Sequence, residues 1–193
     1  SLYQLTIEGG TAFGDRYAAG KLRGLPDEDR AADMFELTQE LCDQHGFPAY
    51  EVSNHAKSGS ESIHNKIYWK YGDYVGIGPG AHGRLTLNGQ KFATETHLTP
   101  GRWLKSVTEN ASGESERTLL SSEDQVTEFL LMGLRLNESV DLGRLPDAAV
   151  QKLGYKIKEL TDSGFIERSG DLLTATSAGR PVLNGVLRHL LDD

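Results

Sequence analysis

A single cysteine, Cys42, limits how this chain of 193 residues can be held together. One thiol cannot form a disulfide within the chain. It also cannot supply the three or four thiolates that normally hold an iron–sulfur cluster. The fold must therefore rest on a packed core. Because an unpaired thiol suits a reducing compartment, the sequence predicts a cytoplasmic protein.

Charge and hydropathy argue against two further classes of protein. The formal net charge is −8 and the isoelectric point is near 5.3, which disfavours extensive binding to a phosphate backbone but is compatible with a local basic patch. The apolar runs are far shorter than the roughly 20 residues of a membrane-spanning helix. No basic segment followed by an apolar one opens the chain, so no signal peptide is expected.

The N-terminal part follows the order strand, helix, strand. Residues 2–8 are β-formers that begin almost at the first residue, so we expect a fragment whose preceding part held the rest of a sheet. A helix with acidic residues in its first turn and one apolar face is predicted from Pro26 to His45 and Gly46. Residues 47–53 are the next predicted strand. The pattern is typical of a βαβ unit.

The middle of the chain is rich in Gly, Ser, Asn and aromatic residues, and Asn88-Gly89 predicts a hairpin turn. The elements expected here are short strands at 74–77, 84–87 and 92–96, a helix at 100–108 and a polar linker at 110–118. The last part has the outline of a winged helix. Its predicted elements are a helix with a capping box at Ser122 and Gln125, a helix at 148–163, a wing of strands 165–168 and 172–175, and a helix at 176–191.

A winged helix can bind nucleic acid, and Lys152, Lys156 and Lys158 could form a basic stripe. Residues 119–193, however, carry twelve acidic and eight basic residues. The charge balance favours a winged helix that packs against protein, with nucleic-acid binding as the alternative.

The residues best suited to chemistry lie between positions 64 and 83. Gly78, Gly80 and Gly83 match G-x-G-x-x-G, but a predicted strand follows them, so a dinucleotide fingerprint is not indicated. These glycines either permit close approach of a flat ligand or only shape a turn. No zinc-hydrolase or nucleophile-elbow motif is present.

His64 precedes Tyr68 and Trp69, and it shares a face with Tyr68 if residues 64–70 are helical. Its imidazole could offer an axial nitrogen to haem iron in an aromatic pocket. The alternative is a histidine that is hydrogen-bonded within an aromatic core.

Five segments, in this order, resemble a single family. They are residues 2–8, 50–56, 64–69, 74–83 and 131–136. The family is that of the radical S-adenosylmethionine (SAM) protein oxygen-independent coproporphyrinogen III oxidase and its relatives. The H-N-x-x-Y pattern at His64 resembles the haem-chaperone branch, HemW. The resemblance covers the family's C-terminal half, so the half with the CxxxCxxC cluster motif is absent.

The resemblance implies an α+β fold in three parts. Residues 1–53 would be the closing βαβ edge of an incomplete (β/α)6 radical SAM barrel. Residues 54–117 would be a connecting region with short strands. Residues 118–193 would be a C-terminal domain with a winged-helix-like end. The 4Fe-4S cluster and SAM would be bound mainly by the absent half.

The resemblance also implies a site. Haem would bind at His64, Asn65 and Tyr68, with the His64 imidazole as ligand of the haem iron. A loop would approach bound SAM, and its residues are Gly78, Gly80, Ala81 and His82. The predicted function is haem binding and delivery to respiratory acceptor proteins. The alternative is oxidative decarboxylation of coproporphyrinogen III, started by a 5′-deoxyadenosyl radical, and we expect no enzymatic activity from the fragment alone.

Overall fold

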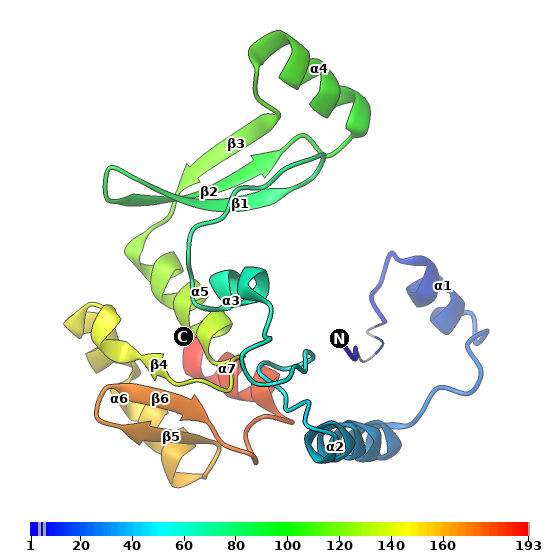
Figure 1. Ribbon diagram of the computed structural model, residues 1–193, viewed down its shortest axis with the longest axis vertical. Helices are drawn as coiled ribbons and strands as arrows, with labels where there is room; N and C mark the ends of the chain where they lie inside the picture. The colour runs from blue at the N-terminus through cyan, green and yellow to red at the C-terminus, as the bar shows by residue number, and fades with distance from the viewer. Residues whose placement is uncertain (4, 6, 193) are drawn as a thin grey trace. The chain divides into compact units, whose positions relative to one another are not determined.

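The computed structural model describes residues 1–3, 5 and 7–192. The chain divides into two compact units, Ser1–Glu61 and Ser62–Asp193, which are described separately (Figure 1). The division into parts 1–53, 54–117 and 118–193 that the family resemblance implies stays a prediction.

The first unit contains two helices, α1 (Ala12–Ala18) and α2 (Glu28–Gln44). The predicted helix is confirmed as α2. The Asp27 carboxylate accepts the backbone N–H of Arg30 at 2.9 Å, which satisfies an unpaired donor at the helix start. The helix ends before Gly46. The backbone φ at this position is 74°, a left-handed conformation that glycine adopts more easily than other residues. Helix α1 lies between the predicted strand 2–8 and the predicted helix, in a segment for which the sequence analysis predicts no element.

The two strands predicted in the first unit are not formed among the described residues, and residues 4 and 6 of the first strand lie outside that set. A single backbone hydrogen bond, from Leu2 N–H to the Ser53 carbonyl at 2.8 Å, joins the two segments. The second segment makes only an isolated bridge between Ala49 and His55. Two strands alone are marginally stable in water. No apolar side chain described in this unit is fully buried, so no core supports a ladder here.

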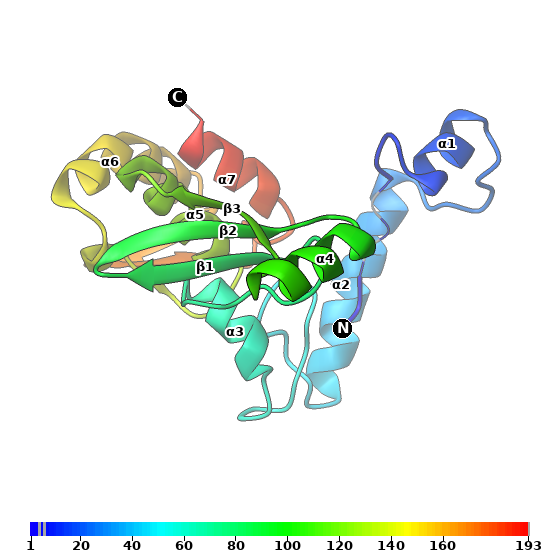
Figure 2. The ribbon, with the colours of Figure 1, turned by 90° about the horizontal axis from the view of Figure 1, so that it is seen from above.

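The second unit begins with α3 (Ile63–Trp69), followed by an antiparallel sheet in the order β1-β2-β3. Its strands are β1 (His82–Leu87), β2 (Gln90–Thr96) and β3 (Glu114–Leu119). Figure 2 shows the three strands side by side. The turn prediction is confirmed, because Asn88 and Gly89 have φ values of 51° and 77°, as a type I′ turn requires.

Strand β3 was predicted to be part of a linker, and that prediction is wrong. Its side chains are mostly charged and exposed, so the sequence shows no alternation of apolar and polar residues. The strand forms because its backbone pairs with β2 along an edge, where charged side chains are tolerated. The helix between them, α4 (Pro100–Asn110), confirms the predicted one.

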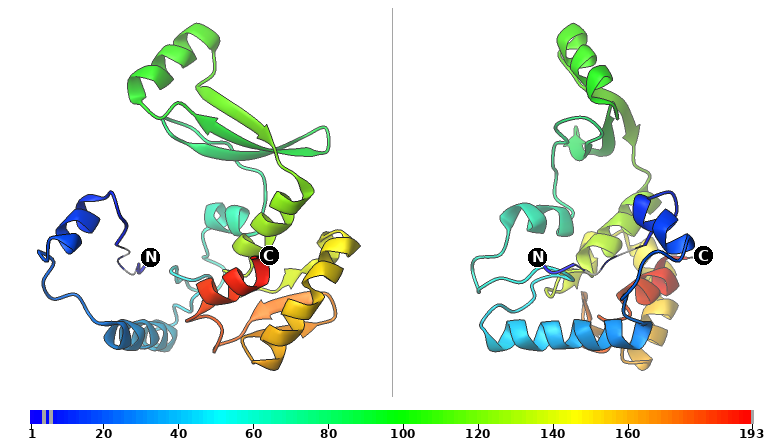
Figure 3. Two further views of the ribbon diagram at one scale, coloured as in Figure 1. Left: turned by 180° about the vertical axis from the view of Figure 1, so that it is seen from behind. Right: turned by 90° about the vertical axis from the view of Figure 1, so that its right-hand side faces the viewer.

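The winged-helix-like end is confirmed. Its elements are α5 (Ser122–Gly133), β4 (Val140–Asp141), a 3-10 turn (Leu142–Arg144), α6 (Asp147–Asp162), β5 (Ile166–Ser169), β6 (Leu172–Ala175) and α7 (Leu183–Leu191). The sheet order is β4-β6-β5, and α6 contacts both β5 and α7 (Figure 3). The final helix starts later than predicted, after a series of turns. The capping box lies one residue earlier than predicted, at Ser121 and Asp124.

The core of the described residues lies entirely within this end of the chain. Leu130, Leu142, Leu173 and Leu190 have no exposed surface. Gly133 permits close packing of α5 on β4, because a Cβ there would lie 2.7 Å from a Val140 methyl group. Among the described residues, no helix has the length and apolar character needed to cross a bilayer.

Candidate functional site

Helix α3 carries an exposed histidine that is bound to a tyrosine one turn later. The Ser62 hydroxyl caps the helix by accepting the N–H of Asn65 at 3.2 Å. His64 Nε2 and the Tyr68 hydroxyl are 2.8 Å apart. The His64 and Tyr68 rings are 4.6 Å apart between centroids and meet edge to face at 87°. The sequence expectation that these residues share a helix face is confirmed.

A second tyrosine extends this pair into an array of three rings. The Tyr68 and Tyr74 centroids are 4.3 Å apart, with an interplanar angle of 76°. Burial raises the pKa of Tyr74, against the opposing effect of nearby Arg84. His64, Tyr68 and Tyr74 are hereafter called the aromatic array.

The base of α3 is held by charged contacts to the segment after α5. Glu138 forms ion pairs with Lys66 and, at 2.5 Å, with Lys70. Hydrogen bonds from Lys66 and then Lys70 lower the pKa of the Glu138 carboxyl. The Arg135 guanidinium lies over the Trp69 ring at 5.8 Å from the centroid, within the range of a cation–π contact. These contacts fix the orientation of the helix that presents His64.

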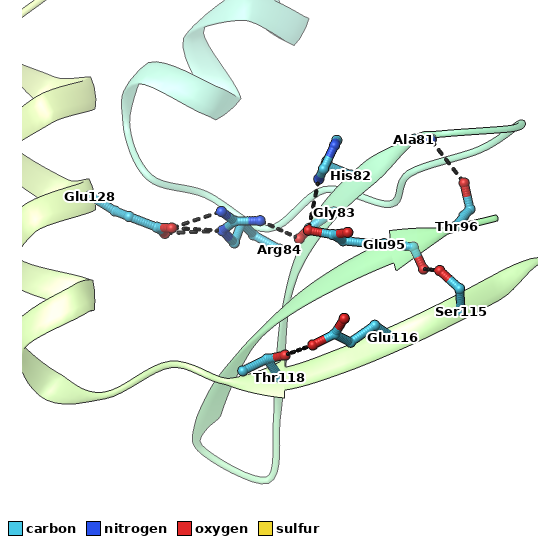
Figure 4. Close-up of polar contacts among 10 residues, drawn as sticks. All are labelled: Ala81, His82, Gly83, Arg84, Glu95, Thr96, Ser115, Glu116, Thr118 and Glu128. Atoms are coloured by element: carbon cyan, nitrogen blue, oxygen red, sulfur yellow. Dashed lines mark hydrogen bonds and ion pairs between the residues drawn. The ribbon is translucent and has the colours of Figure 1, made fainter. Parts of the chain in front are cut away.

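The other end of the aromatic array is tied to β1 and α5. Tyr74 and Arg84 exchange two backbone hydrogen bonds of 2.8 and 2.9 Å. The Arg84 guanidinium makes hydrogen bonds of 2.7, 3.0 and 3.1 Å to the Glu128 carboxylate on α5 (Figure 4). These hydrogen bonds raise the pKa of Arg84 further above its usual value.

A carboxylate one residue before Tyr74 stabilises the same junction. Asp73 accepts hydrogen bonds from the Thr86 N–H at 2.6 Å and from Lys91 Nζ at 3.0 Å. Burial alone would raise the pKa of Asp73, but the hydrogen bonds from Lys91 and Thr86 lower it overall. Lys91 also lies over the Tyr71 ring, 4.1 Å from its centroid. Burial, followed by the neighbouring Glu128 carboxylate, raises the pKa of Tyr71.

The glycine loop before β1 is closed by its own hydrogen bonds. The Ala81 N–H donates to the Thr96 hydroxyl at 2.8 Å (Figure 4). The Thr96 hydroxyl in turn donates to the Gly78 carbonyl at 2.5 Å. The Gly80 N–H donates to the backbone carbonyl of His97 at 3.0 Å. The two amides are thus already paired, whereas a Cβ on Gly78 would meet no atom within 4 Å. The Gly80 and Ala81 amides are therefore not free donors, and the backbone of the loop is open at Gly78.

His82 follows this loop and points toward β2. Its Nδ1 lies 3.5 Å from a Glu95 oxygen on the neighbouring strand, and both side chains are exposed (Figure 4). The structure brings His64, Asn65 and Tyr68 together on α3 and gathers Gly78, Gly80, Ala81 and His82 at the start of β1. Tyr74 and Arg84 connect the two groups.

The sequence analysis missed Tyr74 and the Arg84–Glu128 pair as parts of the site. In the sequence Tyr74 is the first residue of a predicted strand and of the segment 74–83 that resembles the family, but neither pattern gives its side chain a role. The pairing of Arg84 with Glu128 joins positions 44 residues apart, which no local pattern indicates.

The potential metal-binding side chains of the described residues are dispersed. No cluster of three His, Cys, Asp or Glu residues within the described ranges could hold a metal ion. Cys42 is half-buried on α2. The chain's residues therefore do not fit a 4Fe-4S cluster, whereas an exposed imidazole beside aromatic rings fits one axial position of a haem.

The lysines of the predicted basic stripe each have an oxygen partner. Lys152 Nζ lies 3.0 Å from Glu123, and Lys158 Nζ lies 2.5 Å from Asp162. Lys156 donates to the backbone carbonyl of Asp192. A phosphate backbone would have to compete with these partners.

Comparisons with known proteins identify the family. Residues 120–182 match the HemN C-terminal domain. Heme chaperone HemW of Escherichia coli is 33% identical over 200 residues, which cover 99% of this chain and 49% of that protein. HemW of Lactococcus lactis is 34% identical over 199 residues, covering 100% and 50%. This chain belongs to the HemW and HemN family.

Other members agree with that placement. Radical S-adenosyl methionine domain-containing protein 1, mitochondrial, of Danio rerio is 34% identical over 202 residues, covering 99% of this chain and 45% of the relative. The solved structure of coproporphyrinogen III oxidase (HemN) from Escherichia coli, a radical SAM enzyme, has a TM-score of 0.66 at 14% identity, covering 91% of this chain and 44% of that one. This similarity shows the HemN fold and confirms the predicted fold class. The chain spans about half the length of the curated relatives it matches.

Proposed function

We propose that this member of the HemW and HemN family contributes a haem-binding site, with His64 as axial ligand of the iron. The observation that carries the proposal is the exposed His64 imidazole, which is held by Tyr68 at one nitrogen and packs edge to face on the Tyr68 ring. The Tyr68 ring in turn packs on Tyr74. A neutral imidazole is a standard axial ligand of haem iron, and aromatic rings favour a flat apolar macrocycle. Asn65 adds a half-buried amide on the same helix.

In the complete protein, haem held in this way would be passed to acceptor proteins, among them respiratory ones. Haem is then cargo rather than a resident cofactor. Support comes from the relatives named heme chaperone HemW. The 4Fe-4S cluster and most SAM contacts would come from residues outside this chain, while Gly78, Gly80, Ala81 and His82 would border the SAM cavity. The cytoplasmic location stays a prediction, since some relatives are named as mitochondrial.

A visible-absorption titration with haem tests the proposed site. The parent chain is compared with His64→Ala and with His189→Ala, a control at a partly exposed histidine beside Glu159. We expect a Soret shift that saturates near one equivalent in the parent and the control but is lost in His64→Ala. The same shift in all three proteins would refute His64 as the ligand.

The HemN fold supports a second function, oxidation of coproporphyrinogen III. Full-length protein assayed anaerobically with SAM, a reductant and coproporphyrinogen III separates the two. Sustained formation of protoporphyrinogen would replace the chaperone assignment with the oxidase.

A further inference from the structure

The two ring nitrogens of His64 have different surroundings. Nε2 is 2.8 Å from the Tyr68 hydroxyl. Nδ1 has no protein partner in the part of the chain that the structure describes. Since the imidazole is exposed, Nδ1 is the nitrogen that is open to an incoming ligand.

This asymmetry matches the usual arrangement at metal-bound histidines. Such a histidine normally donates its other ring N–H to an oxygen, which fixes the tautomer and the ring orientation. The Tyr68 oxygen can accept a hydrogen bond from the Nε2–H group while its own hydroxyl donates a hydrogen bond to water. The opposite arrangement, with Tyr68 donating to Nε2, would put the proton on Nδ1 and block both nitrogens.

Tyr74 determines where the Tyr68 hydroxyl lies. Its ring meets the Tyr68 ring edge to face at 4.3 Å between centroids. Its backbone is fixed by two hydrogen bonds to Arg84, and the Arg84 side chain is bound to Glu128 on α5. Tyr68 therefore packs against an aromatic ring whose backbone is held in place.

We infer that His64 binds iron through Nδ1, and that Tyr74 is a positioning residue that keeps the Tyr68 oxygen at Nε2. The inference rests on the proposed haem site and extends it to a residue outside the H-N-x-x-Y pattern.

The tautomer of His64 tests the inference without haem. Long-range ¹H–¹⁵N correlation spectra of the ¹⁵N-labelled chain show which ring nitrogen carries the proton, and the His64 signals are assigned by their loss in His64→Ala. We expect a proton on Nε2 in the parent and in Tyr74→Phe, which keeps the ring. Tyr68→Phe and Tyr74→Leu should show a mixture of both tautomers. A proton on Nδ1 in the parent, or an unchanged spectrum in both variants, would overturn the inference.

Haem titration separates failure of the inference from failure of the proposed function. Tyr68→Phe should weaken haem binding about tenfold, and Tyr74→Leu roughly three- to tenfold. Tyr155→Leu, the same change at an exposed tyrosine on α6, should bind as the parent does. Circular dichroism checks that each variant is folded.

If haem binding does not depend on His64, the proposed function fails and the Nδ1 assignment fails with it. The spectra alone then decide the role of Tyr74. If binding depends on His64 but Tyr68→Phe and Tyr74→Leu bind as the parent does, the inference fails and the proposed function stands.

Discussion

The ion pair between Arg84 and Glu128 should be one of the strongest polar contributions to the stability of the second unit. The two side chains are each about 20% exposed and come from β1 and α5. They share three hydrogen bonds. The matched control is the pair of Arg117 and Glu114, which also has two parallel hydrogen bonds of 2.8 Å. The control pair lies within one strand, and its side chains are 42% and 27% exposed.

The structure permits an estimate of the coupling energy. At the closest N···O distance of 2.7 Å, an effective dielectric of 20 gives a gross attraction of about 6 kcal/mol. Desolvation and loss of side-chain freedom offset much of this. Because hydrogen bonds to charged groups contribute about 2 kcal/mol to stability, we expect a net coupling energy of about 2 kcal/mol between Arg84 and Glu128. For a folding unit of about 130 residues, this corresponds to a fall of roughly 7 °C in Tm.

A double-mutant cycle measures this coupling. Arg84→Gln, Glu128→Gln and the double variant are unfolded by heat and by urea, with circular dichroism as the readout. The same cycle is made for Arg117 and Glu114, where solvent screens the charges and we expect no measurable coupling. If the Arg84–Glu128 coupling is no larger than that of the control, the pair does not tie β1 to α5.

Four further substitutions test the stability of the second unit. Asp73→Asn should lower the free energy of unfolding by roughly 1 kcal/mol at pH 7. Because the folded-state pKa of Asp73 is lowered from 3.8, this contribution is present above pH 3.8 and is lost as the pH falls through the folded-state pKa; a pH-independent effect would contradict this. Gly83→Ala should destabilise by roughly 1–3 kcal/mol, because its Cβ would lie 2.5 Å from the Thr94 hydroxyl. Gly154→Ala on α6, where a Cβ meets no atom within 4 Å, should instead stabilise by up to about 1 kcal/mol in the same urea titration. Leu130→Ala should cost about 2–5 kcal/mol by urea unfolding, and a smaller loss would contradict the position of the core.

Local signals in the sequence predicted most helices and turns. The acidic first turn and the apolar face of α2 and the Asn88-Gly89 turn depend only on residues close in the sequence, so a single sequence is enough to predict them. The same holds for the β5–β6 wing and for the placement of His64 and Tyr68 on one helix face. Motif resemblance added the family, which the comparisons confirm.

Long-range pairing explains what the sequence did not predict. Strand β3 forms by backbone pairing with β2, and β4 by two residue pairs with β6. Neither has an apolar repeat. The strands expected in the first unit require a ladder and a core that its described residues do not provide. The role of Tyr74 depends on contacts with Tyr68 and Arg84, which become visible only when the chain is folded.

Pulsed electron paramagnetic resonance of the ferric-haem complex tests the central claim most directly. In chain labelled with ¹⁵N only at histidine, coupling between iron and a histidine nitrogen identifies the axial ligand. The account predicts this coupling in the parent and in His189→Ala, and its loss in His64→Ala. Coupling that persists in His64→Ala, or that is absent from the parent complex, would contradict the assignment of His64 as the haem ligand.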